Sequence, residues 1–198
     1  MNWILASGSP RRRELLEMLG VPNLTIRPAK GPERATPGAG PEQTVRELAL
    51  HKAQEVAQTC APEVAQTCAP EDIIIAADTI VYLDGVILGK PKDTADAARM
   101  LAALSGREHT VYTGVAVLRG GETRQAAEHT AVRFRTLTPE EIARYIATGE
   151  PMDKAGAYGI QGRGALFVAH LDGDYFNVMG LPLCRLGQLL NELGVELL

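Results

Sequence analysis

The run IIIAADTIVYL, from Ile73 to Leu83, is apolar and rich in β-branched residues, and it therefore predicts a β-strand. Asp84-Gly85 follows this run and precedes a second apolar run, VIL, which is the pattern of a tight β-hairpin. Strand-like and helix-like segments alternate along the rest of the chain, and some neighbouring strands are joined by glycine-containing turns. The fold class is therefore mixed α/β with hairpins, not a strict strand–helix–strand repeat.

The other elements follow from hydrophobic periodicity and from local start and stop signals. Pro10 after Ser9 marks a helix start with Ser9 as its cap, and Thr138-Pro139-Glu140-Glu141 has the capping-box pattern. We expect helices over residues 9–19, 41–57, 93–104 and 138–147, and a last one from about residue 182. We expect strands over residues 2–6, 109–118, 124–134, 165–170 and 175–178.

With 198 residues, of which 45% are hydrophobic and 22% charged, the composition is typical of a soluble globular protein. A formal net charge of −4 gives no indication of general nucleic-acid binding or of a membrane surface. An anionic ligand must therefore be bound by a local cluster of basic residues. Cys60, Cys68 and Cys184 form no CxxC pair, and the apolar stretch near the start is too short for a signal peptide, so we expect a cytoplasmic protein.

The peptide EVAQTCAP occupies residues 55–62 and recurs unchanged at residues 63–70. Its period is much shorter than the roughly 20–45 residues of a solenoid repeat. Lengthening a surface loop costs little free energy. We therefore interpret residues 55–70 as a tandem-duplicated surface segment within a single domain that covers residues 1–198.

The segment SGSPRRR, from Ser7 to Arg13, places three arginines where a small-residue loop leads into a helix. Cations in the first helical turn are disfavoured by about 0.3–1 kcal/mol each, unless an anion binds between them and the first main-chain N–H groups. Arginine also presents N–H groups that match phosphate oxygens. We therefore expect a phosphate site at Arg11 and Arg12, with Arg13 in solvent because successive helical residues diverge in direction. The alternative is a solvated basic turn.

Asp78 interrupts the apolar strand at residues 73–83. A carboxylate in such a strand must be exposed at an edge, paired with a cation or bound to a metal, because an isolated buried charge is costly. Lys90, in LGKP after the hairpin, is brought back towards Asp78 by the Asp84-Gly85 turn. The alternative is a structural aspartate that is hydrogen-bonded to neighbouring main chain.

Three further polar residues are weaker candidates by themselves. Glu33 lies in a polar loop and Lys52 on a helix, where solvation is the usual state. The segment DKAGAYGIQG, residues 153–162, combines glycines that allow a ligand to approach the main chain with Gln161, whose amide both donates and accepts. The alternative for this segment is an ordinary flexible loop.

Four segments in order, LASGSPRRRELLEMLG, ADTIVYLDGVILGKP, VYTGVAV and DKAGAYGIQG, resemble the Maf-like nucleoside triphosphate pyrophosphatases. The resemblance extends from residue 3 to the GLPL segment near the C-terminus. It implies hydrolysis of a nucleoside triphosphate to the monophosphate and pyrophosphate with a divalent metal cation, Mg²⁺ or Mn²⁺. It also implies an elongated α/β fold with flanking helices and a cleft between two lobes, similar to inosine triphosphate pyrophosphatases, and a homodimer.

The same resemblance implies roles for individual residues. Asp78 matches the family's proton acceptor, and Asp78 and Glu33 match its metal ligands. The loop around Glu33, AKGPERAT, is less acidic than the family's pattern. The residues that match phosphate contacts are Ser7, Arg11, Arg12, Lys52 and Lys90.

Members of the family differ in substrate. The subgroup that prefers dTTP and UTP has Arg, Thr and Gln at its specificity positions, matched here by Arg11, Thr79 and Gln161. A sister subgroup that acts on 7-methyl-GTP has Glu in its last loop, next to a Cys-Ala-Gly context. We therefore expect a dTTP/UTP pyrophosphatase. The alternatives are a 7-methyl-GTP pyrophosphatase and a nucleotide-binding regulator of cell division without turnover.

Overall fold

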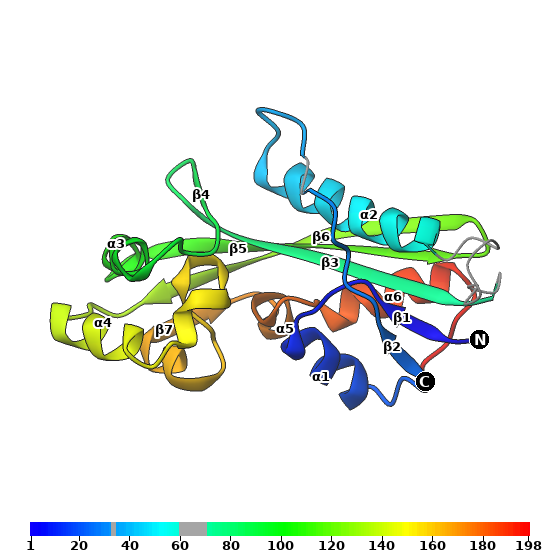
Figure 1. Ribbon diagram of the computed structural model, residues 1–198. Helices are drawn as coiled ribbons and strands as arrows, with labels where there is room; N and C mark the ends of the chain where they lie inside the picture. Colours follow the sequence, from blue (N-terminus) through cyan, green and yellow to red (C-terminus); the bar gives the residue numbers. More distant parts are fainter. Residues whose placement is uncertain (33–34, 60–70) are drawn as a thin grey trace. The chain divides into compact units, whose positions relative to one another are not determined.

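The computed structural model describes residues 1–32, 35–59 and 71–198 (Figure 1). Within these residues, one seven-stranded sheet has the order β2-β1-β3-β5-β6-β7, with β4 paired to β3. The strands are β1 (Trp3–Leu5), β2 (Leu24–Ile26), β3 (Ile73–Leu83), β4 (Val86–Leu88), β5 (Glu108–Arg119), β6 (Glu122–Phe134) and β7 (Val168–Asp172). The α-helices are α1 (Pro10–Met18), α2 (Pro41–Thr59), α3 (Thr94–Leu104), α4 (Pro139–Ile146), α5 (Tyr175–Met179) and α6 (Leu183–Glu192). The mixed α/β class is confirmed.

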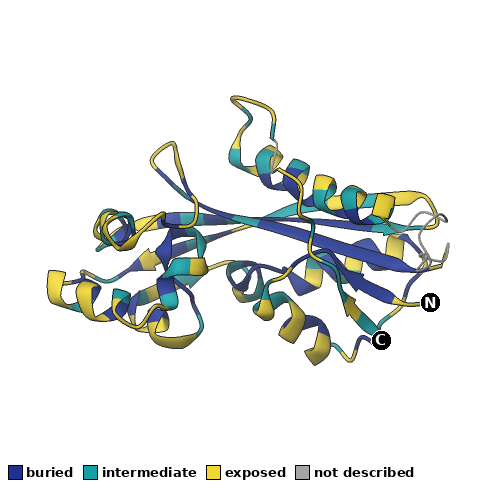
Figure 2. Cartoon of the chain, viewed as in Figure 1, coloured by how far each residue is buried: buried dark blue, intermediate teal, exposed yellow. Residues whose placement is uncertain are grey.

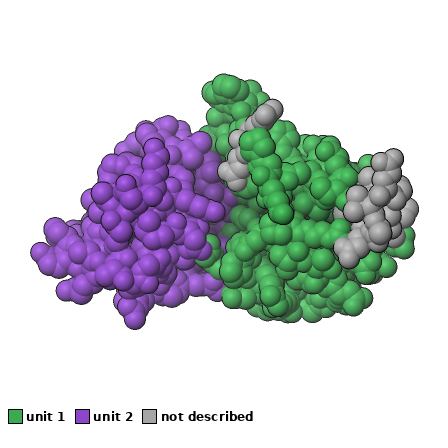
Figure 3. Space-filling view, viewed as in Figure 1, with its two compact units in different colours: residues 1–78, 113–128, 180–198 green, residues 79–112, 129–179 purple. Residues whose placement is uncertain are grey.

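The chain divides into two compact units, which Figure 3 draws in different colours. Unit 1 comprises residues 1–78, 113–128 and 180–198. Unit 2 comprises residues 79–112 and 129–179. The first passage of the chain from unit 1 to unit 2 therefore falls inside β3, between Asp78 and Thr79. The expected cleft between two lobes stays a prediction.

In unit 1, strand β1 pairs in parallel with both β2 and β3, so that Trp3 lies opposite Leu24 on one side and Ile73 on the other. Parallel strands that are covered on both faces are continuous apolar runs. Both β1 and the first part of β3 are buried residue after residue (Figure 2). One core cluster joins these strands to α2 through Ile4, Ile74, Ala49, Ala53 and Val56.

Gly114, the glycine of VYTGVAV in β5, is where helix α2 comes closest to the sheet. A Cβ atom built on Gly114 would lie 2.1 Å from the main-chain oxygen of Val45 and 2.7 Å from the main-chain nitrogen of Arg46. Both neighbours are main-chain atoms, so no side-chain rotation relieves the contact. The distance between α2 and the sheet therefore requires glycine at this position.

We expect Gly114→Ala to lower the free energy of unfolding by about 1–3 kcal/mol, because the added methyl group displaces the backbone of α2. Urea unfolding followed by circular dichroism measures the change. Gly187→Ala in α6 is the matched control, since a Cβ atom there meets no other atom within 4 Å. It should stabilise the protein by about 0.5–1 kcal/mol through helix propensity. Equal effects of the two substitutions would contradict the role of Gly114.

In unit 2, the two local start and turn signals in the sequence are confirmed. Asp84 and Gly85 both have positive φ, 48° and 84°, as the hairpin between β3 and β4 requires. Thr138 and Glu141 form both hydrogen bonds of the capping box at the start of α4. Glu141 also accepts from Nη1 and Nη2 of Arg135 at 3.0 and 2.8 Å, and the Arg135 contact lowers the pKa of Glu141 to about 2.

His109 is a buried titratable group of unit 2. It is 3% exposed, and its ring packs edge-on against the rings of Phe134 and Tyr158. Its Nε2 lies 2.8 Å from the Tyr158 hydroxyl, and its Nδ1 has no hydrogen-bond partner in the described part of the chain. Burial lowers the pKa of His109 from 6.5 to about 4. The folded protein therefore holds this ring neutral.

Below the ordinary pKa of histidine, the unfolded chain binds a proton at His109 that the folded chain does not. We therefore expect stability to fall as the pH falls from 6.5 to about 4, by about 3 kcal/mol from this residue. Urea unfolding at a series of pH values measures this loss. The double variant His109→Phe/Tyr158→Phe removes both hydrogen-bonding partners, so the difference between its profile and that of the wild type isolates the histidine. Parallel profiles would contradict the assignment.

One of the expected strands is wrong, and another begins later than expected. Residues 175–178 belong to helix α5, because Oδ1 of Asp174 accepts the N–H of Phe176 at 2.7 Å and so stabilises the first helical turn. Of residues 165–170, the first three belong to a 3-10 helix, Gly162–Phe167, and strand β7 begins only at Val168. Short apolar segments give no periodicity that separates a strand from a helical turn. For the same reason, β2 has no counterpart among the expected strands.

Helix α1 begins where the sequence predicts, with Ser9 at the N-cap position, but the Ser9 side chain makes no capping hydrogen bond. Helix α2 extends to Thr59 and so includes the start of the duplicated segment. Residues 60–70 of that segment lie outside the described residues. Along the parts of the chain that the structure describes, no helix is long and apolar enough to cross a membrane.

Candidate active site

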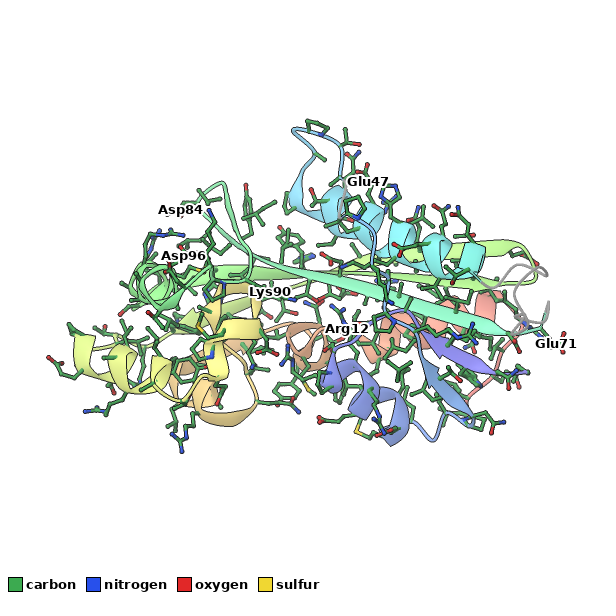
Figure 4. The ribbon with its side chains drawn as sticks, in the orientation of Figure 1. Arg12, Glu47, Glu71, Asp84, Lys90 and Asp96 are labelled. Carbon is green, nitrogen blue, oxygen red and sulfur yellow. The ribbon has the colours of Figure 1, made fainter. Side chains whose placement is uncertain are left out.

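Ser7 and Arg12 form a cluster at the start of α1 in unit 1. The Ser7 hydroxyl accepts from Nη1 of Arg12 at 3.0 Å and from the N–H of Ser9 at 3.3 Å. Nε of Arg12 donates to the main-chain oxygen of Gly180 at 2.7 Å. Gly180 belongs to the GLPL segment, so two motifs that are far apart in the sequence meet at one guanidinium group. Figure 4 labels Arg12 in this position.

The three consecutive arginines have different environments. Arg11 and Arg12 are partly buried, whereas Arg13 is exposed. Nε of Arg13 donates to Glu17 at 2.7 Å, one helical turn further on, which is an ordinary surface ion pair. This agrees with the expectation that Arg13 faces solvent. A phosphate contact of Arg11 and Arg12 stays a prediction. The hydrogen bonds of Arg12 to Ser7 and Gly180 do not test it.

Asp78 is paired with Lys52, which is one of the three possibilities that the sequence leaves open for it. Nζ of Lys52 donates to Oδ1 of Asp78. The side chains of Lys52 and Asp78 are 20% and 11% exposed, so both charges are largely removed from water. Solvation, the usual state of a helical lysine, therefore does not describe Lys52. Helix α2 brings it to the buried strand at the point where the carboxylate interrupts the apolar run.

Two carboxylates of α2, those of Glu47 and Glu55, accept hydrogen bonds from the loop that precedes this helix. Glu55 accepts the N–H groups of Lys30 and Gly31 at 2.6 and 3.0 Å. Glu47, about two helical turns away, accepts the N–H and the hydroxyl of Thr36 at 2.7 and 3.0 Å. The Thr36 N–H is the main cause of the lowered pKa of Glu47. Lys30, Gly31 and Thr36 are therefore hydrogen-bonded to the helix that carries Lys52.

A small hollow of about 50 Å³ lies between this loop and α2. Its lining includes Ala29 and Gly31 from the loop, and His51 and Lys52 from the helix. A hollow of this size holds a water molecule rather than a nucleotide. Glu33, the candidate metal ligand of this loop, lies outside the described residues, so its role stays a prediction.

In unit 2, two of the resembling segments, ADTIVYLDGVILGKP and DKAGAYGIQG, meet around the β3–β4 hairpin. The N–H of Gly156, in DKAGAYG, donates to the main-chain oxygen of Gly89, in LGKP, at 3.0 Å. A Cβ atom on Gly156 would lie 2.8 Å from the side chain of Val81, in ADTIVYL, and its φ is 68°. Gly156 therefore allows both the turn and the close contact. Lys90 follows Gly89 and is exposed.

Gln161 lies just before two residues whose main chain is hydrogen-bonded to Glu150. Its main chain is extended, and its side chain is partly buried. The Glu150 carboxylate accepts the N–H groups of Arg163 and Gly164 at 3.0 and 3.1 Å. The flexible-loop alternative for residues 153–162 stays untested. Thr79, the other specificity candidate of this unit, is partly buried at the point where β3 enters unit 2.

Glu47, Glu55 and Glu150 are functional candidates that the sequence alone does not identify. Each lies on a helix or helical turn, where an exposed glutamate is common and carries no special signal. They are distinguished by their contacts: each carboxylate accepts a main-chain N–H group from a loop residue that is not its neighbour in the sequence. A local hint is that one of the loop residues bound by Glu55, and one bound by Glu150, is a glycine: Gly31 and Gly164.

The donor chemistry of Asp78 fits a divalent cation such as Mg²⁺, since a carboxylate oxygen is the ligand type that this ion prefers. Among the described residues, no group of three His, Cys, Asp or Glu side chains is placed to hold a metal. Mg²⁺ is commonly bound by one or two carboxylates together with substrate phosphates. The residues present therefore fit a cation that binds together with a phosphorylated substrate.

The Lys52–Asp78 pair can be tested by a double-mutant cycle. Lys52→Met leaves a mostly buried carboxylate without this cation, and Asp78→Asn leaves the ammonium group without this anion. We expect each single change to destabilise the protein. We expect the double variant to lose less stability than the sum of the two single losses. The coupling free energy should be about 1–3 kcal/mol in urea unfolding. A coupling near zero would show that the pair does not contribute to folding.

Comparison with known proteins gives similarity over nearly the whole chain. The Maf-like protein family matches residues 2–193. A dTTP/UTP pyrophosphatase of Moorella thermoacetica is 52% identical over 98% of this chain and 95% of its own length. One of Symbiobacterium thermophilum is 50% identical over 96% and 93%. The dITP/XTP pyrophosphatase structure from Mycobacterium abscessus aligns with a TM-score of 0.43 at 18% identity, over 77% of this chain and 100% of that one.

Proposed function

Because the chain belongs to the Maf-like protein family, we propose that it hydrolyses dTTP and UTP to the nucleoside monophosphate and pyrophosphate. The observation that carries this proposal is its near-full-length similarity to relatives named dTTP/UTP pyrophosphatase, at 52% and 50% identity. Possible natural substrates include modified pyrimidine nucleotides with the same base edge. A cytoplasmic location and a homodimer are further parts of the proposal.

Asp78 is the proposed proton acceptor. A water molecule near the carboxylate transfers a proton to it while the water oxygen forms a bond to the α-phosphorus. The bond between the α-phosphorus and its bridging oxygen breaks, and pyrophosphate leaves with that oxygen. A carboxylate is a weak base at neutral pH, so the orientation of the water supplies much of the effect. The fixed position of Asp78 in a buried strand, next to Lys52, supports this role.

The triphosphate carries several negative charges that the site must balance. Lys52, Arg11, Arg12 and Lys90 are the proposed cationic contacts, and Ser7 is a proposed hydrogen-bond donor. When bound at Asp78 and Glu33, a divalent cation, Mg²⁺ or Mn²⁺, neutralises phosphate charge and polarises the reacting phosphate. Arg11, Thr79 and Gln161 are the proposed specificity residues, because they match the family's pyrimidine subgroup.

Product analysis tests the reaction and the substrate together. We expect pyrophosphate and dTMP or UMP from dTTP and UTP in the presence of Mg²⁺ or Mn²⁺, and little product from 7-methyl-GTP or dATP. Ion-exchange chromatography separates pyrophosphate from phosphate. Hydrolysis of 7-methyl-GTP instead would keep the chemistry and change the subgroup. Tight nucleotide binding without any product would favour the regulator of cell division.

We expect Asp78→Asn to fold but to lose turnover of dTTP by about 100- to 10,000-fold, because the amide cannot accept the proton. The matched control is Asp84→Asn, the same change at an exposed hairpin carboxylate that pairs with Arg107. It should leave turnover within about twofold of the wild type, as surface pairs contribute little. Near-normal turnover by Asp78→Asn would remove Asp78 from this role.

A further inference from the structure

Glu150 binds more hydrogen-bond donors than a surface glutamate normally does. Its two carboxylate oxygens accept the N–H of Arg163, the N–H of Gly164 and the hydroxyl of Tyr145, at 3.0, 3.1 and 2.9 Å. Burial raises the pKa of Glu150. The hydrogen bonds from these three donors lower the pKa by more than burial raises it, so the pKa lies below the ordinary value. The group is therefore held as a carboxylate, which can accept from all three donors.

Tyr145 extends this network to the other side of the same loop. Its side chain belongs to α4 and is 4% exposed. The hydroxyl donates to Glu150 and accepts the N–H of Gly159 at 3.3 Å. One buried hydroxyl and one carboxylate therefore hold both ends of the segment from Gly159 to Gly164, and Gln161 lies between them.

Two glycines of this segment have no room for a side chain. A Cβ atom on Gly162 would lie 2.9 Å from Oε2 of Glu150, and Gly162 has a φ of 75°. A Cβ atom on Gly164 would lie 2.4 Å from the main-chain oxygen of Gly159. The loop is thus folded tightly around the carboxylate. These contacts hold the main chain on both sides of Gln161, whose side chain is partly buried.

We propose that Glu150, together with Tyr145, is a positioning residue for base recognition by Gln161. This inference rests on the proposed function, in which Gln161 contacts the pyrimidine base. An amide pairs with the N3–H and O4 edge of thymine in one orientation and with the edge of cytosine after a half-turn of its side chain. A loop that moves allows both arrangements. A loop that is held at both ends fixes the main-chain atoms from which the Gln161 side chain extends, and so limits the positions from which its amide reaches the base edge.

The role of Glu150 differs from that of the residues that act on phosphate. Its contacts lie entirely within unit 2 and involve the loop of residues 159–164, whereas Asp78 and Lys52 belong to unit 1. Loss of Glu150 should therefore change KM and base discrimination much more than kcat. A general loss of structure would instead lower kcat for every nucleotide alike.

The test compares dTTP with dCTP, which have the same sugar and triphosphate and differ in the base edge. In Glu150→Gln, the amide NH₂ faces a main-chain N–H or the Tyr145 hydroxyl in place of an acceptor oxygen. We expect the ratio of kcat/KM for dTTP over dCTP to fall by about 10- to 100-fold, mainly through a higher KM for dTTP. Tyr145→Phe should act in the same direction, and the double variant should be no worse than Glu150→Gln alone, because both residues serve one network.

Asp72→Asn is the matched control, since Asp72 is a buried carboxylate of unit 1 that accepts the N–H of Asn2 at 2.6 Å. It should leave the dTTP/dCTP ratio unchanged even where it lowers stability. An unchanged ratio in both Glu150→Gln and Tyr145→Phe, or an equal fall of kcat for both nucleotides, would overturn this inference alone. Absence of pyrophosphate release from dTTP by the wild type would overturn the proposed function and this inference with it.

Discussion

The ion pair between Lys52 and Asp78 sets the arrangement of unit 1. A carboxylate in a buried strand must be matched by a cation, and the cation comes from α2. Lys52 reaches the strand only if α2 lies close to the sheet, and Gly114 provides that distance because it has no side chain between the sheet and the backbone at Val45. A packing requirement in the core and the position of the proposed proton acceptor therefore depend on the same contact.

The loops of both units are fixed by one recurrent interaction, a carboxylate that accepts main-chain N–H groups. Glu55 and Glu47 hold the loop beside α2, and Glu150 holds the loop that carries Gln161. Such hydrogen bonds to a charged acceptor are stronger than neutral ones. They keep glycine-rich segments in one conformation, so that side chains on these segments have defined positions. Rigid loops of this kind suit the recognition of one base edge.

Each of the two proposed tasks, reaction at phosphate and recognition of the base, uses residues of both units, since Lys90 belongs to unit 2 and Arg11 to unit 1. Asp78, Lys52 and Arg12 belong to unit 1, whereas Gln161 and the carboxylate that fixes its loop belong to unit 2. Strand β3 is continuous through the boundary, with Asp78 as the last residue on one side and Thr79 as the first on the other. A catalytic candidate and a specificity candidate are thus consecutive residues of one strand.

The sequence by itself determined the features that depend on neighbouring residues. The bounds of β3, the hairpin turn at Asp84-Gly85 and the capping box at Thr138 are set by local backbone preference and short-range hydrogen bonds. The order of the motifs also identified the family and the candidate residues Asp78 and Gln161. Local preference failed where it was weak, and residues 175–178 form a helix where a strand was expected.

Only the tertiary structure decided which residues act together. The partner of Asp78, the contact of Arg12 with Gly180 and the donors of Glu150 are all side-chain or loop contacts. The two residues of the first pair are 26 positions apart, and those of the second 168. No periodicity or propensity relates residues at such separations, because the contact exists only after helices and loops have packed. A carboxylate within an apolar run predicts from the sequence that a partner is needed, and the tertiary packing determines which residue that partner is.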